Sequence, residues 1–350
     1  MKRYNPTSLS IGHVLDEAAG EEVLQSQSAT DIDLTGTRFV DPHGLLSLLE
    51  ACRSAKNNGK RLRVRMPADD SVLSYIERIG FSQHVRPFAR LIRCDGKPYR
   101  VRASDSAVSM TDDTSASESR DDSVRVTDSL SPCSTGPVID ACAVAAGRTA
   151  APARPSDVLL EVTLIENSRD VNSLVGRVKQ RAQLILRKHL FYDEARIVRF
   201  IVALAELCQN IYEHSNTVGY VSIQKYRYEN IRRNVVKIAV TDVGIGMKQS
   251  LSPRLASGFG GRWTDLVAME QAFRHGISRF ADPGRGHGLR CVRELVTAWD
   301  GKITIRSGRG RLAVSPAWAK PSSTDDALPY FPGTQIFMTL PAADEPQSGD

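Results

Sequence analysis

Long apolar segments are missing from this sequence. No run of about 18 apolar residues occurs, which is the minimum for a transmembrane helix, and residues 1–6 lead into no apolar stretch of the kind that a secretory signal needs. We therefore expect a cytoplasmic protein that neither spans a membrane nor is secreted.

Cysteine is scarce. The six cysteines among 350 residues form no C-x-x-C pair, so we expect reduced thiols and neither a disulfide framework nor a zinc site. The sequence also lacks H-E-x-x-H and G-x-x-x-x-G-K-[ST], which excludes a zinc hydrolase of that type and a P-loop nucleotide site.

A large excess of one charge is missing as well. Lys and Arg number 46 against 40 Asp and Glu, so the net charge is only +6. The basic residues stand in short groups such as Arg232-Arg233, whereas a nucleic-acid-binding surface needs them clustered on one face. We do not expect a nucleic-acid partner.

Aromatic residues are absent between Tyr99 and Phe191, and much of this interval is rich in Ser, Thr, Ala and Pro. Such a segment buries too little apolar area to offset the entropy lost on ordering. We predict a flexible, disordered linker there, and the length of the chain also favours about two domains. The predicted division is a domain at 1–100, the linker at 101–156, a domain at 157–341 and a tail at 342–350.

The first domain alternates short helices and strands. Strands are predicted at 31–34 and 62–66, and helices from about residue 45 to the Asn58-Gly59 pair and over 71–79. This alternation predicts a small α/β domain around a partly parallel sheet.

The second domain begins with longer elements. Its predicted helices lie at 171–189, 194–214, 265–275 and 289–299, and its predicted strands at 159–164, 221–226, 235–241, 303–305 and 335–340. Helices gathered on one face of a mixed sheet predict an α+β sandwich.

The helix at 194–214 carries the most informative side chains. Its apolar stripe at helical spacing consists of Ile197, Ile201, Leu204, Cys208 and Ile211. Glu206 and Asn210 lie nearly opposite that stripe, one turn apart, so their side chains point into the same space. A carboxylate can take a proton from an attacking water or hydroxyl, and an amide oxygen can ligate Mg²⁺. An isolated pair of this kind is most often a solvated polar face.

Two glycine-containing motifs follow the helix. Asp242, Gly244 and Gly246 end an apolar strand, where a carboxylate can accept a hydrogen bond from an exocyclic amine and the glycines let the backbone approach a flat ring. A second run, with Gly284, Gly286 and Gly288, opens a helix and exposes backbone N–H groups to an anion. It follows a loop instead of a strand, which excludes the dinucleotide-binding fingerprint.

In this order, and with Gly333-Thr334 before the last strand, the motifs resemble the GHKL family of ATPases, which includes gyrase and the histidine kinases. The resemblance covers about residues 157–341 and implies ATP and Mg²⁺ as cofactors. The two helices at the start of the domain most resemble those of the anti-sigma-factor serine kinases.

The resemblance implies a role for each motif residue. Glu206 is the implied general base, Asn210 the Mg²⁺ ligand and Asp242 the residue that binds the adenine amino group. The other implied contacts are with the adenine site for Gly246 and Thr334, and with the phosphates for Gly284, Gly286, His287 and Gly288. A lid over the nucleotide is expected within residues 247–283, made flexible by glycines at 258–261.

The first domain resembles the STAS fold of anti-sigma-factor antagonists, through the strand at 31–34 and the segment at 39–45. Those proteins typically carry D-S-S-G-L, and here Pro42 and His43 occupy the two serine positions, which removes the usual phosphate acceptor. We interpret the domain as an interaction module in which His43 is partly exposed; a phosphoacceptor or a pH-sensitive contact is the alternative.

Three functions follow as hypotheses. The first is an ATP-dependent regulatory protein that hydrolyses ATP with Mg²⁺ and is sensed by the STAS-like domain or a regulatory protein partner, as a monomer or a homodimer. The second is an anti-sigma-type serine/threonine kinase acting on a partner. The third is an interaction module that binds nucleotide without hydrolysing it. A histidine kinase is disfavoured, because it needs a dimerisation helix with an acceptor histidine before the ATPase motifs. The predicted helix at 171–189 has only His189, at its end, and the segment before it is the predicted linker.

Overall fold

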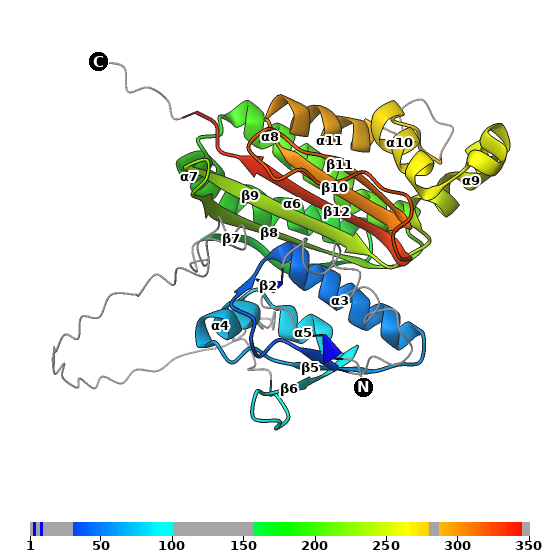
Figure 1. Cartoon of the computed structure of the whole chain (residues 1–350). Coiled ribbons are helices and arrows are strands. Elements are labelled where there is room, and N and C mark those ends of the chain that lie inside the picture. The colour runs from blue at the N-terminus through cyan, green and yellow to red at the C-terminus, as the bar shows by residue number, and fades with distance from the viewer. Residues whose placement is uncertain (1–2, 5–7, 10–30, 101–156, 280–286, 345–350) are drawn as a thin grey trace, which may run out of the picture. The chain divides into compact units, whose positions relative to one another are not determined.

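The computed structural model describes residues 3–4, 8–9, 31–100, 157–279 and 287–344 (Figure 1). The predicted linker, the residues after 344, and the predicted site residues Gly284 and Gly286 lie outside these ranges. The described residues before and after the linker belong to one compact unit. We call those up to residue 100 the N-terminal region and those from 157 the C-terminal region.

The N-terminal region is an α/β structure with short elements. In chain order these are β1 (Arg3–Tyr4), β2 (Ser8–Leu9), β3 (Asp31–Asp33), β4 (Phe39–Val40), α3 (Pro42–Asn57), β5 (Leu62–Arg65), α4 (Asp70–Arg78), α5 (Phe81–Val85) and β6 (Ala89–Ile92). The main sheet has the order β1-β3-β5-β6, and each of its described pairs is parallel. The predicted α/β alternation is confirmed, and the pairing is parallel throughout the described strands.

Helix α3 is buried on nearly every side. Asp41 caps its N-terminus by accepting a hydrogen bond from the Gly44 amide at 2.9 Å, and Pro42 takes the first helical position, where its missing N–H costs nothing. Its leucines pack into the core of the N-terminal region. Its polar residues Glu50 and Arg53 are buried too, so a second surface must cover this helix.

The C-terminal region contains one large sheet and its helices. Its elements are β7 (Val158–Ile165), α6 (Ser168–Ala182), the π-helical turn η3 (Gln183–Arg187), α7 (Lys188–Leu190), α8 (Glu194–His214), β8 (Gly219–Tyr228), β9 (Arg233–Asp242), α9 (Gly246–Phe259), the 3₁₀ turn η4 (Gly260–Arg262), α10 (Asp265–His275), α11 (His287–Ala298), β10 (Lys302–Gly308), β11 (Gly310–Val314) and β12 (Phe331–Pro341). The six strands have the order β11-β10-β12-β9-β8-β7. None of the helices in the described part of the chain combines the length and the apolar character that membrane crossing requires.

The prediction of a mixed sheet is wrong for this region. All five pairs of neighbouring strands are antiparallel. The connection from β7 to β8 explains one of them: it contains two long helices in succession, α6 and α8. Two helices that run in opposite directions return the chain to the end of the sheet where β7 finished, so β8 must start there and run antiparallel to it.

The two faces of this sheet are covered differently. Figure 1 shows α6, α8 and α11 on one face, where Val236, Ile238 and Val240 of β9 join the core of the C-terminal region. Between them Ala239 points to the other face and belongs, with Phe337, to the hydrophobic cluster of the N-terminal region. The prediction of helices on one face therefore holds for this region's own helices, while α3 packs on the opposite face.

His43 lies in the contact between α3 and the sheet. Its side chain is buried with 3% exposure, its Nε2 lies 3.2 Å from the Ile238 carbonyl oxygen, and its ring packs against Phe337. Burial lowers the pKa of His43 to about 4, so the ring is neutral at physiological pH. The prediction of a partly exposed histidine is wrong, because α3 is covered on the side where a free-standing domain would meet water.

The predicted lid segment is largely helical. Helices α9 and α10 occupy most of residues 246–275, and the glycines at 258–261 end α9 and form the turn η4, with the ring of Phe259 packed at 5.3 Å on that of Trp263. The expectation of a flexible glycine run is therefore replaced by a packed helix end. Residues 280–286 lie outside the description.

Candidate functional site

A pocket of about 300 Å³ opens beside α8 in the C-terminal region. This volume lies at the lower end of the range for small-molecule sites. Six of the predicted site residues line it: Glu206, Asn210, Asp242, Gly246, Gly288 and Thr334. The structure therefore brings together residues that are as far as 128 positions apart in the sequence, from Glu206 to Thr334.

The other predicted site residues are placed less directly. Gly244 does not line the pocket but lies beside it, where its amide donates a hydrogen bond to the Asp242 Oδ1 atom at 2.8 Å. His287 begins α11, one position before Gly288. Gly284 and Gly286 fall outside the described residues.

Helix α8 holds Glu206 and Asn210 rigidly. Asp193 caps it by accepting from the Arg196 amide at 2.7 Å, and its apolar stripe is buried in the core of the region. The opposite stripe, half-buried, faces the pocket. The Asn210 Nδ2 atom is buried and has no hydrogen-bond partner among the described protein groups.

Asp242 ends β9 at the wall of the pocket and is 5% exposed. Burial raises its pKa to about 7, although the amides of Gly244 and Thr334 and the Arg53 guanidinium act in the opposite direction. A buried carboxylate with its own backbone donors is a directional acceptor for a ligand N–H group.

Gly244 allows two loops to touch. A Cβ atom at this position would lie 2.0 Å from the Ser215 carbonyl oxygen, which is far inside van der Waals contact. The same carbonyl accepts a hydrogen bond from the Ile245 amide at 3.0 Å. The turn after α8 and the loop after Asp242 are therefore in direct contact.

Gly288 lies against the Glu206 carboxylate. A Cβ atom on Gly288 would come within 2.4 Å of Glu206 Oε2 and 3.2 Å of Glu206 Cβ. This contact places the first turn of α11 beside the candidate general base. Helix N-termini favour anions, so the arrangement can hold negative charge near this carboxylate.

We predict that Gly288→Ala slows any reaction that depends on Glu206. The added methyl group forces the carboxylate to move by a fraction of an ångström or more, and misplacement on this scale is expected to lower kcat about tenfold. Steady-state kinetics on the full chain checks this result.

Gly176→Ala is the matched control, because a Cβ at this position in α6 meets no atom within 4 Å. Alanine in a helix interior stabilises by roughly 0.5–1 kcal/mol relative to glycine, so this variant should keep full activity. Equal activity of Gly288→Ala and the unsubstituted chain would contradict the assigned contact.

The pocket also contains residues that sequence reasoning did not assign to the site. Glu213 and His214, at the end of α8, line its wall together with Ser278 and Arg279. The spacing of Glu213 and His214 from Asn210, three and four residues on, puts them on the same helical face and was the available signal. Ser278 and Arg279 carried no such periodic signal.

Comparison with curated proteins and with solved structures gives no match. Residues 195–344 match the family model described as "Histidine kinase-, DNA gyrase B-, and HSP90-like ATPase". The match covers nearly all of α8, both glycine motifs and the last strand, so it contains all six of the predicted site residues that line the pocket. This part of the chain is similar to the ATPase domains of that family.

Proposed function

We propose that the chain binds ATP with Mg²⁺ in this pocket and hydrolyses it, and that it acts as a regulatory protein whose STAS-like N-terminal region serves interaction or sensing. The observation that carries the proposal is the convergence of Glu206, Asn210 and Asp242 on one pocket. A general base, a hard-cation ligand and a buried acceptor are the groups that ATP chemistry needs.

Asp242 is proposed to bind the adenine end. Its carboxylate would accept from the exocyclic amine; Gly246 and Thr334 line the same pocket, and the Thr334 amide donates to Asp242. Because its pKa is about 7, the carboxylate is partly charged at neutral pH and can be fixed in the charged form by a donor.

Asn210 is proposed to hold Mg²⁺. No group of three or more His, Cys, Asp or Glu side chains that could form a metal site occurs among the described residues. Mg²⁺ needs no such group, since it is usually held by one or two side chains, water and substrate phosphates. Asn210 lines the pocket, and its Oδ1 atom is the group that would serve as this single protein ligand. When bound, the ion neutralises phosphate charge.

Glu206 is proposed to act as the general base. It lies one helical turn before Asn210 and against Gly288, so its carboxylate stands where the phosphate end of a nucleotide anchored at Asp242 and Asn210 would lie. There it can take a proton from the attacking water. Gly284, Gly286 and His287 are proposed to lie beside the phosphates.

A kinase that transfers the γ-phosphoryl group to a partner protein is the second candidate. It needs a hydroxyl acceptor near Glu206, and Pro42 and His43 provide none at the start of α3. His43 is also buried against Phe337, which removes it as an accessible acceptor. We propose that in this case the acceptor hydroxyl belongs to a regulatory partner.

Incubation of the full chain with γ-labelled ATP and Mg²⁺, with and without cell extract, separates the candidates. Label released as phosphate by the protein alone supports the ATPase. Label on another protein supports the kinase, and binding of ATP with neither product supports the non-hydrolysing module. Absence of ATP binding under all conditions would reject the proposal.

A further inference from the structure

Helix α3 runs along strand β9 toward the candidate adenine end. Asp41 accepts a hydrogen bond from Lys237 at 2.6 Å, and nine residues later Glu50 accepts from the Thr241 hydroxyl at 3.4 Å. Nine residues of helix and four residues of extended strand each span about 14 Å. The two contacts are therefore spaced equally along α3 and along β9. Thr241 directly precedes Asp242.

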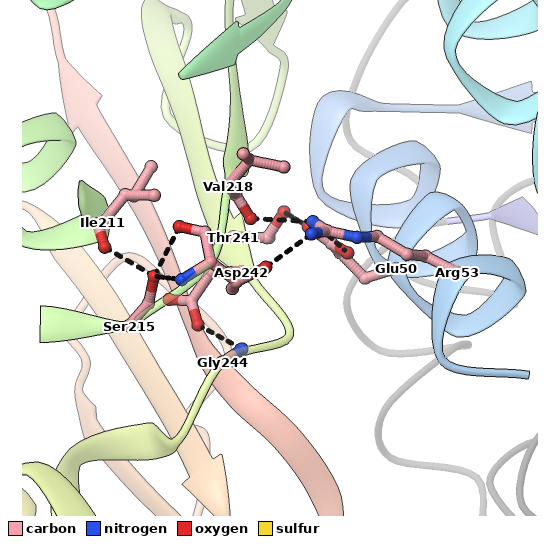
Figure 2. Close-up of polar contacts among 9 residues, drawn as sticks. Glu50, Arg53, Ile211, Ser215, Val218, Thr241, Asp242 and Gly244 are labelled. Atoms are coloured by element: carbon pink, nitrogen blue, oxygen red, sulfur yellow. Dashed lines mark hydrogen bonds and ion pairs between the residues drawn. The ribbon is translucent and has the colours of Figure 1, made fainter. Parts of the chain in front are cut away.

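Arg53 of α3 also contacts the C-terminal region, at the turn after α8. It donates to the Val218 carbonyl oxygen at 2.7 Å and to the Thr217 hydroxyl at 2.6 Å (Figure 2). Its side chain is only 10% exposed and lies 3.7 Å from Glu50 Oε2. Charged hydrogen bonds shielded from water in this way are among the stronger ones in proteins.

The turn that Arg53 holds is joined to Asp242. Thr217 donates its amide to the Ser215 hydroxyl at 3.1 Å, and the Ser215 carbonyl accepts from Ile245 at 3.0 Å. Gly244 packs on that carbonyl and donates to the Asp242 carboxylate. An unbroken set of contacts therefore runs from Arg53 to the candidate adenine-binding side chain.

Arg53 also acts on the local charges. Burial raises the pKa of Glu50 to about 8, and both the Arg53 guanidinium and the Thr241 hydroxyl lower it, while Asp242 raises it further. The same guanidinium opposes the raised pKa of Asp242. The positive charge of Arg53 therefore favours the ionised form of Asp242.

We propose that Arg53, supported by Glu50, is a positioning residue that holds the turn at 215–218 and the loop after Asp242, so that adenine recognition depends on the docking of α3. The proposal rests on the proposed ATP site and adds that the N-terminal region contributes to it from the opposite face of the sheet.

This coupling works in both directions. If docked α3 strengthens adenine binding by some factor, bound ATP must strengthen the docking of α3 by the same factor. The occupied nucleotide site thereby becomes detectable at the surface of the N-terminal region, which is what a regulatory module needs.

The test compares Arg53→Gln with Arg53→Lys in the full chain. Arg53→Gln should weaken ATP binding about tenfold, the amount expected for one hydrogen bond to a charged group, and should weaken GTP binding much less. Arg53→Lys keeps the positive charge but not the two guanidinium donors, so it should restore part of the lost ATP affinity. A merely structural role would lower the affinities for both nucleotides together and show no such rescue.

Arg63→Gln is the matched control, because Arg63 forms an ion pair with Asp31 inside the N-terminal sheet. It should leave both affinities unchanged. Thr217→Val removes the hydroxyl that accepts from Arg53 and leaves Arg53 in place. This variant provides the test if Arg53→Gln folds poorly. Its effect should be smaller, and the double variant should be less than additive.

Amide hydrogen exchange of the protein without nucleotide separates this proposal from the ATP site itself. Arg53→Gln should speed exchange at residues 215–219 and 241–245 and leave the middle of the six-stranded sheet unchanged. If the wild-type chain binds no ATP but Arg53→Gln still changes exchange in this local pattern, the proposed function is overturned and the role of Arg53 in holding the turn and the loop stands. Unchanged exchange in Arg53→Gln, or equal effects of Arg53→Gln and Arg63→Gln on ATP binding, would overturn the positioning role of Arg53.

Discussion

Glu206→Gln is expected to lower ATP turnover by about two to four orders of magnitude, the usual contribution of a general base. Glutamine keeps the size of the side chain and its place against Gly288, but it cannot take the proton of the attacking water. The Kd for ATP should change by no more than about threefold, because the base contributes in the transition state and little in the ground state.

Glu194→Gln controls for this change. It is the same substitution in the same helix, at the exposed first turn, where Glu194 pairs with Arg187 at the surface. Exposed ion pairs contribute little to stability, so turnover should stay at the wild-type level. Measurement of kcat and of nucleotide affinity on both variants decides the case: turnover that survives Glu206→Gln rules out Glu206 as the base.

Asp242→Asn is expected to shift the preference between ATP and GTP by about 100-fold, the upper range for a hydrogen bond to a charged group. The backbone amides of Gly244 and Thr334 already bond to Asp242. Asparagine has one acceptor oxygen, which these amides take, so its NH₂ group is left facing the adenine amine as a second donor. Guanine carries a carbonyl oxygen at the corresponding ring position and should lose little affinity.

Asp193→Asn is the matched control for that variant. Asp193 caps α8 about 20 Å of helix away from the pocket, and asparagine caps helices as well as aspartate does. Competition binding with ATP and GTP measures both variants. Equal losses of ATP and GTP affinity in Asp242→Asn would show that Asp242 supports the pocket without reading the base.

Asp242→Asn should also alter the pH dependence of the stability of the folded chain. The pKa of Asp242 is about 7 in the folded chain against an ordinary value of 3.8, so the folded state holds a proton that the unfolded state has released. Stability is therefore lost as the pH rises from about 4 to 7. Asp242→Asn removes this loss, and its Tm relative to wild type should be higher at pH 8 than at pH 4. A difference in Tm that is independent of pH would contradict the raised pKa.

Much of the C-terminal region was predictable because its signals are local. The predicted helices at 194–214 and 265–275 agree with α8 and α10 to the residue, since each has a capping side chain directly before its first turn and a clear apolar stripe. Helix α9 was not predicted. It contains Pro253 and buries only Ser250 and Leu251, so it carries almost no amphipathic pattern.

The sequence by itself determined the motifs: Glu206 one turn before Asn210, the glycines around Asp242, and the glycine run ending at Gly288. Spacing along one helix or at one strand end is enough to predict where such side chains point. The match to the ATPase family at residues 195–344 agrees with the sequence-based expectation, and six of the predicted residues line one pocket.

Only the tertiary structure decided the direction of the strands, the burial of His43 and the contact of Arg53 with the turn after α8. Each of these joins residues far apart in the chain, and the Arg53 hydrogen bonds span about 165 positions. A buried arginine on a helix looks, in sequence, like any solvated one. Arg53 can hold the turn after α8 only because the C-terminal region covers α3. Local sequence patterns do not show which surface covers a helix.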